Sequence, residues 1–169
     1  MIIANYMTFS DVVLDVTEGP PHAVFRQLLA PLRRENALIQ VESIVDDLAA
    51  REEMMSTALG QGYAIPHTHT AQIASPRIII GRSLKGIDFK AIDCEPVHCF
   101  FLILYPKDAG ETHMILLSRL SQLMMNTPLM ERILMARDSE NMIKTIAHCE
   151  KSLSAKPGTP AGTSDTAGK

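Results

Sequence analysis

Cysteine, aromatic residues and net charge are all scarce in this chain, and each shortage excludes a class of protein. Cys94, Cys99 and Cys149 are odd in number and form no C-x-x-C pair, so we expect neither a disulfide framework nor a zinc knuckle. Reduced thiols of a cytoplasmic protein fit this pattern. Aromatic residues make up 5% of the chain and the formal net charge is -3. Few rings are therefore available to stack on bases and no basic patch can neutralise a run of phosphates, which excludes nucleic acid as the expected partner.

Long apolar segments are also missing. The start, MIIANYMTFSDVV, has no basic segment followed by a long apolar core, so it does not resemble a signal peptide. The longest apolar run, CFFLILY at 99–105, has the length of a strand, whereas a membrane-spanning helix needs roughly 18 or more apolar residues. We therefore expect no direct membrane insertion and a cytoplasmic location.

The composition that remains is that of one globular domain. The 169 residues are 46% hydrophobic and 21% charged, which is enough apolar material to bury a core. From Ser152 the sequence changes to SLSAKPGTPAGTSDTAGK, with one large apolar residue and no periodicity. We expect a single domain at 1–150 and a disordered tail or linker remnant at 151–169.

Helical and strand patterns alternate along the domain. Apolar residues recur at helical spacing in four segments, whereas three others are short, apolar or β-branched runs bounded by turn residues. This alternation predicts an α/β fold, with a sheet layered between helices. The predicted helices lie at 22–38, with a kink or turn at Pro31, and at 41–55, 111–126 and 139–151; the predicted strands lie at 12–16, 77–83 and 97–105.

One histidine stands out in the segment GQGYAIPHTHTAQ. Pro66 fixes one backbone angle and favours an extended residue before it, so the chain should leave a short strand at 63–65 in a set direction. The side chain of His67 would then project from a strand end, where α/β sheets usually bind their ligands. Gly60 and Gly62 let the backbone turn closely before that strand, which suits a concave site for a phosphate or a partner loop, although a plain turn would use the same residues.

Two further residues complete a candidate site. His113 lies in the first turn of the predicted helix at 111–126, where free N–H groups and the helix dipole favour an anion. Arg51 lies at the C-terminal end of the helix at 41–55; its alternative role is a solvated charge that balances Glu52 and Glu53. A neutral imidazole is a nitrogen nucleophile, and an arginine with helix N–H groups stabilises a transferred phosphoryl group. The remaining histidines have structural or solvated interpretations: His22, His69, His98 and His148.

These motifs together resemble a known family. AREEMMSTALGQGYAIPHTHT and GRSLKGIDFKAIDCEPVHCFFLILYPKDAGETHMILLSRLSQLM are similar to the enzyme IIA domains of the bacterial phosphoenolpyruvate-dependent phosphotransferase system, in the fructose, mannitol and nitrogen-regulatory class. The resemblance covers roughly 9–149. It implies a mixed sheet sandwiched between helices and a phosphocarrier without a bound cofactor or metal. In that family the position of His67 accepts a phosphoryl group from the carrier HPr or its nitrogen-branch paralogue, and the positions of His113 and Arg51 help to hold it.

The resemblance leaves the recipient of the phosphoryl group open. A stand-alone chain favours a nitrogen-type regulatory protein that signals to target proteins, and the alternative is a sugar-transport IIA that donates to a IIB domain. The chain departs from the common pattern at Thr57-Ala58, where many members read T-G, and at Thr68 and His69, where many carry a glycine and a basic residue. A metal-dependent hydrolase that uses His67, His69 and His113 is an alternative of a different class, because H-x-H is a metal-binding spacing. A IIA-like module that binds partners without phosphorylation is another.

Overall fold

A mixed six-stranded sheet forms the centre of the structure, a computed structural model that describes residues 3–155. No helix in this part of the chain is long and apolar enough to cross a bilayer. The elements, in chain order, are η1 (Ile3–Tyr6), η2 (Phe9–Asp11), β1 (Val12–Val13), α1 (Pro21–Leu28), α2 (Ala30–Glu35), α3 (Val41–Met54), β2 (Ala58–Gly60), β3 (Tyr63–Ala64), β4 (His67–Thr70), β5 (Arg77–Ile87), β6 (Val97–Pro106), α4 (Thr112–Asn126), α5 (Leu129–Met135) and α6 (Ser139–Ala155).

The apolar strands β5 and β6 are antiparallel neighbours in the middle of the sheet. The strand order is β1-β5-β6-β3-β2, and β4 pairs with β6 beyond β3. Both β3 and β4 run parallel to β6, with Tyr63 opposite Cys99 and His67 opposite Ile103. The two short strands therefore form one line along β6, which is interrupted at Ile65-Pro66.

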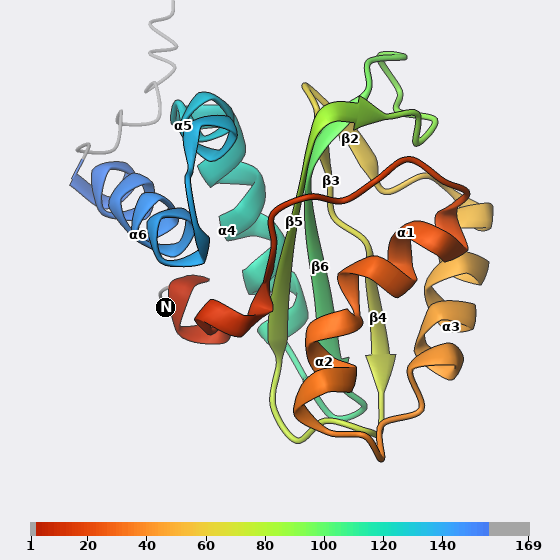
Figure 1. Ribbon diagram of the computed structural model, residues 1–169. Coiled ribbons are helices and arrows are strands. Elements are labelled where there is room, and N and C mark those ends of the chain that lie inside the picture. The colour runs from red at the N-terminus through yellow and green to blue at the C-terminus, as the bar shows by residue number, and fades with distance from the viewer. Residues whose placement is uncertain (1–2, 156–169) are drawn as a thin grey trace, which may run out of the picture.

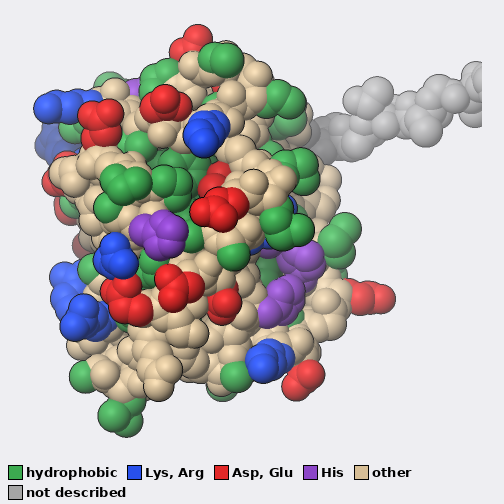
Figure 2. Space-filling model, turned by 90° about the vertical axis from the view of Figure 1, so that its right-hand side faces the viewer, with side chains coloured by type: hydrophobic (Ala, Val, Ile, Leu, Met, Phe, Trp, Pro, Cys, Tyr) green, Lys and Arg blue, Asp and Glu red, His purple; other side chains and the backbone are tan. Residues whose placement is uncertain are grey.

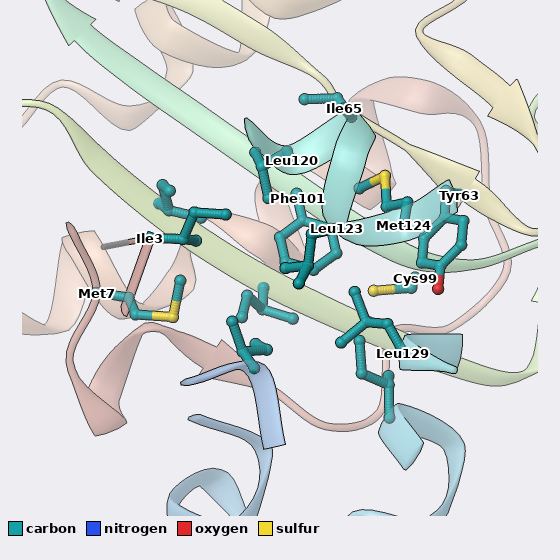
Figure 3. Close-up of a cluster of buried hydrophobic side chains, with 14 of the residues drawn as sticks. Ile3, Met7, Tyr63, Ile65, Cys99, Phe101, Leu120, Leu123, Met124 and Leu129 are labelled. Atoms are coloured by element: carbon teal, nitrogen blue, oxygen red, sulfur yellow. The ribbon is translucent and has the colours of Figure 1, made fainter. Parts of the chain in front are cut away.

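Helices cover both faces of the sheet, as Figure 1 shows. The first three helices, α1 to α3, lie on one face, and α4 to α6 lie on the other together with η1 and η2. Each face has its own buried cluster of apolar side chains. On the α4 face, Leu120, Leu123 and Met124 of α4 pack against Tyr63 of β3 and Phe101 of β6 (Figure 3). Two apolar layers on one sheet confirm the predicted α/β fold with a mixed sheet between helices.

Most predicted elements are present, with shifted ends. The predicted helix at 22–38 is broken at Leu29 into α1 and α2, and Pro31 lies in the first turn of α2, where its missing N–H breaks no helical hydrogen bond. The strand predicted at 77–83 is longer than expected and continues to Ile87. The segment at 67–70, for which no strand was predicted, is strand β4, because its backbone pairs with β6.

Two features at the C-terminal end were not predicted. Helix α5 at 129–135 is too short to give a periodic apolar signal. Helix α6 continues through Ala155, past the predicted domain end at residue 150, so the first residues of the predicted tail are helical. The remainder of that tail, 156–169, lies outside the described residues.

Candidate functional site

A pocket of about 590 Å³ opens at the edge of the sheet where β3 ends and β4 begins. The C-terminal turn of α3, strand β2, the first residue of β4, the β5–β6 loop and one side of α4 surround it. Figure 2 shows the molecule from the side covered by α1–α3, with histidine side chains at the surface among hydrophobic and charged ones. The residues that line the pocket are Arg51, Met55, Ser56, Thr57, Ala58, Leu59, Ile65, His67, Lys90, Ile92, Leu117 and Ser121.

His67 is the half-buried first residue of β4. Its Nδ1 lies 2.8 Å from the carbonyl oxygen of Ile65. A carbonyl oxygen only accepts, so Nδ1 carries the proton and Nε2 is left with a free lone pair. Burial lowers the pKa of His67 below its usual 6.5, and the nearby charges of Arg51 and His69 lower that pKa further. The ring is therefore neutral at pH 7, with one nitrogen available as a nucleophile.

His113 flanks His67 from the first turn of α4. The two ring centroids are 5.6 Å apart, with 40° between the planes. The His113 ring also lies edge-on to Tyr105 of β6, at 4.9 Å. Its Nε2 is buried and has no hydrogen-bond partner among the described residues. Burial, followed by the neighbouring His67 and His69, lowers the pKa of His113. A buried ring nitrogen without a partner is costly, which favours a site that completes its bonding with a ligand.

Arg51 lies in the last turn of α3, as predicted, and lines the same pocket as His67. Its Nη1 donates to the carbonyl oxygen of Met55 at 3.0 Å, which holds the half-buried guanidinium near the helix end. Within residues 3–155 it forms no direct ion pair with Glu52 or Glu53. The structure thus brings Arg51, His67 and His113 together from three elements.

Several neighbours of the site were not identified from sequence. Glu52 is one, because its carboxylate accepts hydrogen bonds from Ser56 Oγ, Thr57 N and Thr57 Oγ1 at 2.8, 2.8 and 2.6 Å and fixes the strand that walls the pocket. Its position next to Arg51 in the R-E pair was the available signal. Lys90 and Ile92 reach the pocket from the β5–β6 loop, and nothing in their local sequence indicates this.

The two glycines serve the protein's own packing. Gly60 and Gly62, at φ 92° and 79°, form the β2–β3 turn, which confirms the close turn expected there. What approaches Gly60 is the side chain of Asp93, which would lie 2.8 Å from an added Cβ and which accepts a 2.7 Å hydrogen bond from the backbone N–H of Gln61. The missing side chain at Gly60 therefore makes room for Asp93 of the β5–β6 loop.

The other histidines are spread over the molecule. His22 is in the first turn of α1, His98 bonds the carbonyl oxygen of Ser83 from the start of β6, and His148 is exposed on α6. Among residues 3–155 no group of three histidine, cysteine, aspartate or glutamate side chains is placed to hold a metal ion. The metal-site alternative therefore has no ligand set in this part of the chain.

Comparisons with known proteins agree with this architecture. The family model described as "Phosphoenolpyruvate-dependent sugar phosphotransferase system, EIIA 2" matches residues 6–149. The fructose-specific EIIABC component of Bacillus subtilis is 30% identical over 89% of this chain, which spans only 24% of that protein. The fructose-specific EIIA component of Haloferax volcanii is 35% identical over 63% of the chain and 69% of its own length.

A solved structure gives the same result. The nitrogen regulatory protein IIA-Ntr from Neisseria meningitidis superposes with a TM-score of 0.77 at 28% identity, over 85% of this chain and 98% of that one. Sequence, fold and a family match across nearly all the described residues lead to one conclusion. The chain belongs to the EIIA type 2 family of the phosphoenolpyruvate-dependent sugar phosphotransferase system.

Proposed function

We propose that this protein is a phosphocarrier that accepts a phosphoryl group on Nε2 of His67 and passes it to a second protein. The observation that carries the proposal is the 2.8 Å hydrogen bond from Nδ1 of His67 to the Ile65 carbonyl, which leaves Nε2 as the one free ring nitrogen in a pocket beside an arginine. The donor is an HPr-type carrier or its nitrogen-branch paralogue, in which the phosphoryl group is also bound to histidine. Such carriers are cytoplasmic, and the same location is proposed here.

The transfer exchanges one phosphorus–nitrogen bond for another. The Nε2 lone pair of His67 attacks phosphorus in line with the donor nitrogen, the new P–N bond forms, and the donor nitrogen recovers the electron pair of the old one. Because the lowered pKa keeps His67 neutral, the lone pair is present at pH 7. No other co-reactant is required.

Charge stabilisation comes from both sides of His67. The transition state spreads negative charge over the phosphoryl oxygens, and the guanidinium of Arg51 faces that charge from α3. On the other side, the buried Nε2 of His113 has no hydrogen-bond partner in the described part of the chain, and as an N–H it would donate to a phosphoryl oxygen. The two residues hold the group without a bound cofactor.

The Ile65 carbonyl also prepares the second transfer. After phosphorylation, the Nδ1 proton remains on the ring and its hydrogen bond stabilises the resulting positive charge. A protonated ring is a better leaving group than a neutral one, so the phosphoryl group stays transferable.

The test is labelling with phosphoenolpyruvate, enzyme I and HPr, followed by acid and base treatment. We expect acid-labile, base-stable label on the wild type, none on His67→Ala, and full label on the matched control His148→Ala, which alters an exposed histidine of α6. Absent label on the wild type, or label that survives in His67→Ala, would overturn the proposal.

The recipient is proposed to be a regulated target protein, as for a nitrogen-type IIA. The fold supports this, because the nitrogen regulatory protein superposes with a TM-score of 0.77. The second candidate is a IIB domain of a fructose-type transporter, which the 35% and 30% identity with the two fructose-specific proteins favours. Mixing the labelled protein with a fructose-type IIB domain separates them: rapid loss of label to IIB would establish the second candidate, and retention would support the first.

A further inference from the structure

A third histidine completes the cluster and has no role in the function proposed above. His69 lies two residues after His67 on β4, so both side chains point to the same face of the strand, about 7 Å apart along it. Its ring centroid is 5.5 Å from that of His113 and 5.4 Å from that of Tyr105, its pairing partner on β6. Unlike His113, the His69 residue is exposed to solvent.

The cations of the pocket are unevenly placed around His67. Arg51 stands on the α3 side and Lys90 at the β5–β6 loop, whereas α4 contributes only Leu117 and Ser121 to the lining. A phosphoryl group brings nearly two negative charges. Its oxygens on the α4 side would therefore meet imidazole rings and no permanent cation.

We propose that His69 takes up a proton from solvent when His67 is phosphorylated, and that its imidazolium then shares the phosphoryl charge with Arg51. The inference rests on the proposed phosphorylation of His67. The step balances: the P–N bond forms on His67 as the donor's P–N bond breaks, and one proton from water binds a ring nitrogen of His69.

Among the groups around the phosphoryl position, His69 is the one that can take up a proton. Tyr105 on β6 is a buried phenol whose pKa is raised by burial, so it stays neutral. His113 on α4 and His67 on its own strand have a lowered pKa and resist protonation. Arg51 and Glu52, on α3, act on His67 from the far side. Within residues 3–155 the His69 ring makes no hydrogen bond or ion pair, so its nitrogens are available in the unphosphorylated protein.

The sign of the pH effect follows from linkage. A dianion on His67, two residues away on the same face of β4, favours the charged imidazolium of His69 over its neutral ring. The phosphorylated protein therefore holds up to one more proton than the unphosphorylated one. Phosphorylation is therefore favoured more strongly at pH 6 than at pH 8.

The direct measurement is an NMR titration of the His69 Cε1–H signal with and without phosphorylation. The phosphorylated state is maintained by phosphoenolpyruvate, enzyme I and HPr, and independently by phosphoramidate, which needs no protein donor. We expect the titration midpoint of His69 to rise by about one pH unit or more, and that of His148 on α6 to stay unchanged. An unmoved His69 midpoint in a protein that carries phosphohistidine would overturn this inference and leave the proposed function intact.

Two substitutions test the consequence for transfer. In the equilibrium with phospho-HPr, His69→Gln should reduce the phosphorylated fraction at pH 6 and flatten its dependence between pH 6 and 8 by up to tenfold relative to His148→Gln. His69→Lys, with a permanent charge, should keep the phosphorylated fraction at pH 8 as high as at pH 6. If both variants follow the His148→Gln profile, His69 carries no charge for the phosphoryl group; if no variant is phosphorylated on His67, the proposed function itself fails.

Discussion

Removal of the Glu52 carboxylate should weaken the fold and the site together. This residue is in the last turn of α3, and its two oxygens receive the hydroxyl of Ser56 and both the N–H and the hydroxyl of Thr57. The Thr57 residue is only 5% exposed, so water does not readily replace the lost partner. The perturbation is Glu52→Ala.

The magnitude follows from the groups left without a partner. The Ser56 hydroxyl can turn to the carbonyl oxygen of Phe89, which already lies 2.9 Å away. The two donors of Thr57 have no such substitute, and a buried unsatisfied donor costs about 1 to 3 kcal/mol. We expect Glu52→Ala to lower the free energy of unfolding by about 2 to 4 kcal/mol, and Glu52→Gln, which keeps one acceptor oxygen, by about half as much.

The assay is urea denaturation at pH 7, with phosphorylation by phospho-HPr measured on the same preparations. The matched control is Glu53→Ala, one residue along the same helix turn, where the side chain is exposed and makes no hydrogen bond or ion pair within residues 3–155. Phosphorylation should slow in Glu52→Ala because Thr57 lines the pocket. Equal unfolding midpoints for the two alanine variants would refute the assignment of Glu52 as the residue that anchors β2.

Three further outcomes are expected. His113→Ala should slow phosphorylation by on the order of 100-fold, as expected when one charge-stabilising hydrogen-bond donor is lost, and thermal unfolding should show that the fold is retained. An unchanged rate in both directions of transfer would show that His113 is not part of the site. Burial lowers the pKa of His67 and His113, so below pH 6.5 the unfolded chain binds more protons than the folded one. The free energy of unfolding should therefore fall on acidification from pH 7 to 5.5, and it should fall less steeply in His113→Asn. Equal slopes for the wild type and the variant would contradict this prediction. Gly60→Ala should destabilise the fold by about 1 to 3 kcal/mol more than Gly110→Ala. Both glycines have positive φ, but only at Gly60 would the added Cβ clash with the side chain of Asp93. Equal unfolding free energies for the two variants would exclude that clash.

Local patterns were enough to predict most of the secondary structure. The runs at 77–83 and 97–105 are strands because they are continuous, β-branched and buried on both faces, and the helix at 41–55 ends within a residue of its predicted limit. Elements that depend on distant partners were not predicted. Strand β4 carries the polar sequence HTHT, and only its pairing with β6 makes it a strand.

In the candidate site, too, the features with a local sequence signal were predicted and those that depend on distant contacts were not. His67 could be singled out from Pro66 before it, and His113 from its place in a helix start, because both signals are local. Their convergence depends on the register between β4 and β6 and on where α4 crosses the sheet, which are contacts between residues far apart in sequence. Glu52 and Lys90 were missed for the same reason, since each acts on a segment that only tertiary packing brings near.

The position of Ile65 explains why the site is at this edge of the sheet. Along the line of β3 and β4, the carbonyl of Pro66 turns inward and accepts the N–H of Ile103 on β6 at 2.8 Å. Because successive carbonyls of an extended chain point to opposite sides, that of Ile65 turns outward, on the same side as its own N–H, which donates to the carbonyl oxygen of Thr57 at 3.0 Å. If a further strand lay beside Ile65 at this point, its backbone would bond to this carbonyl; instead the carbonyl accepts the proton on Nδ1 of His67. The free nitrogen, and with it the proposed chemistry, thus depends on β4 having no strand on its outer side among residues 3–155.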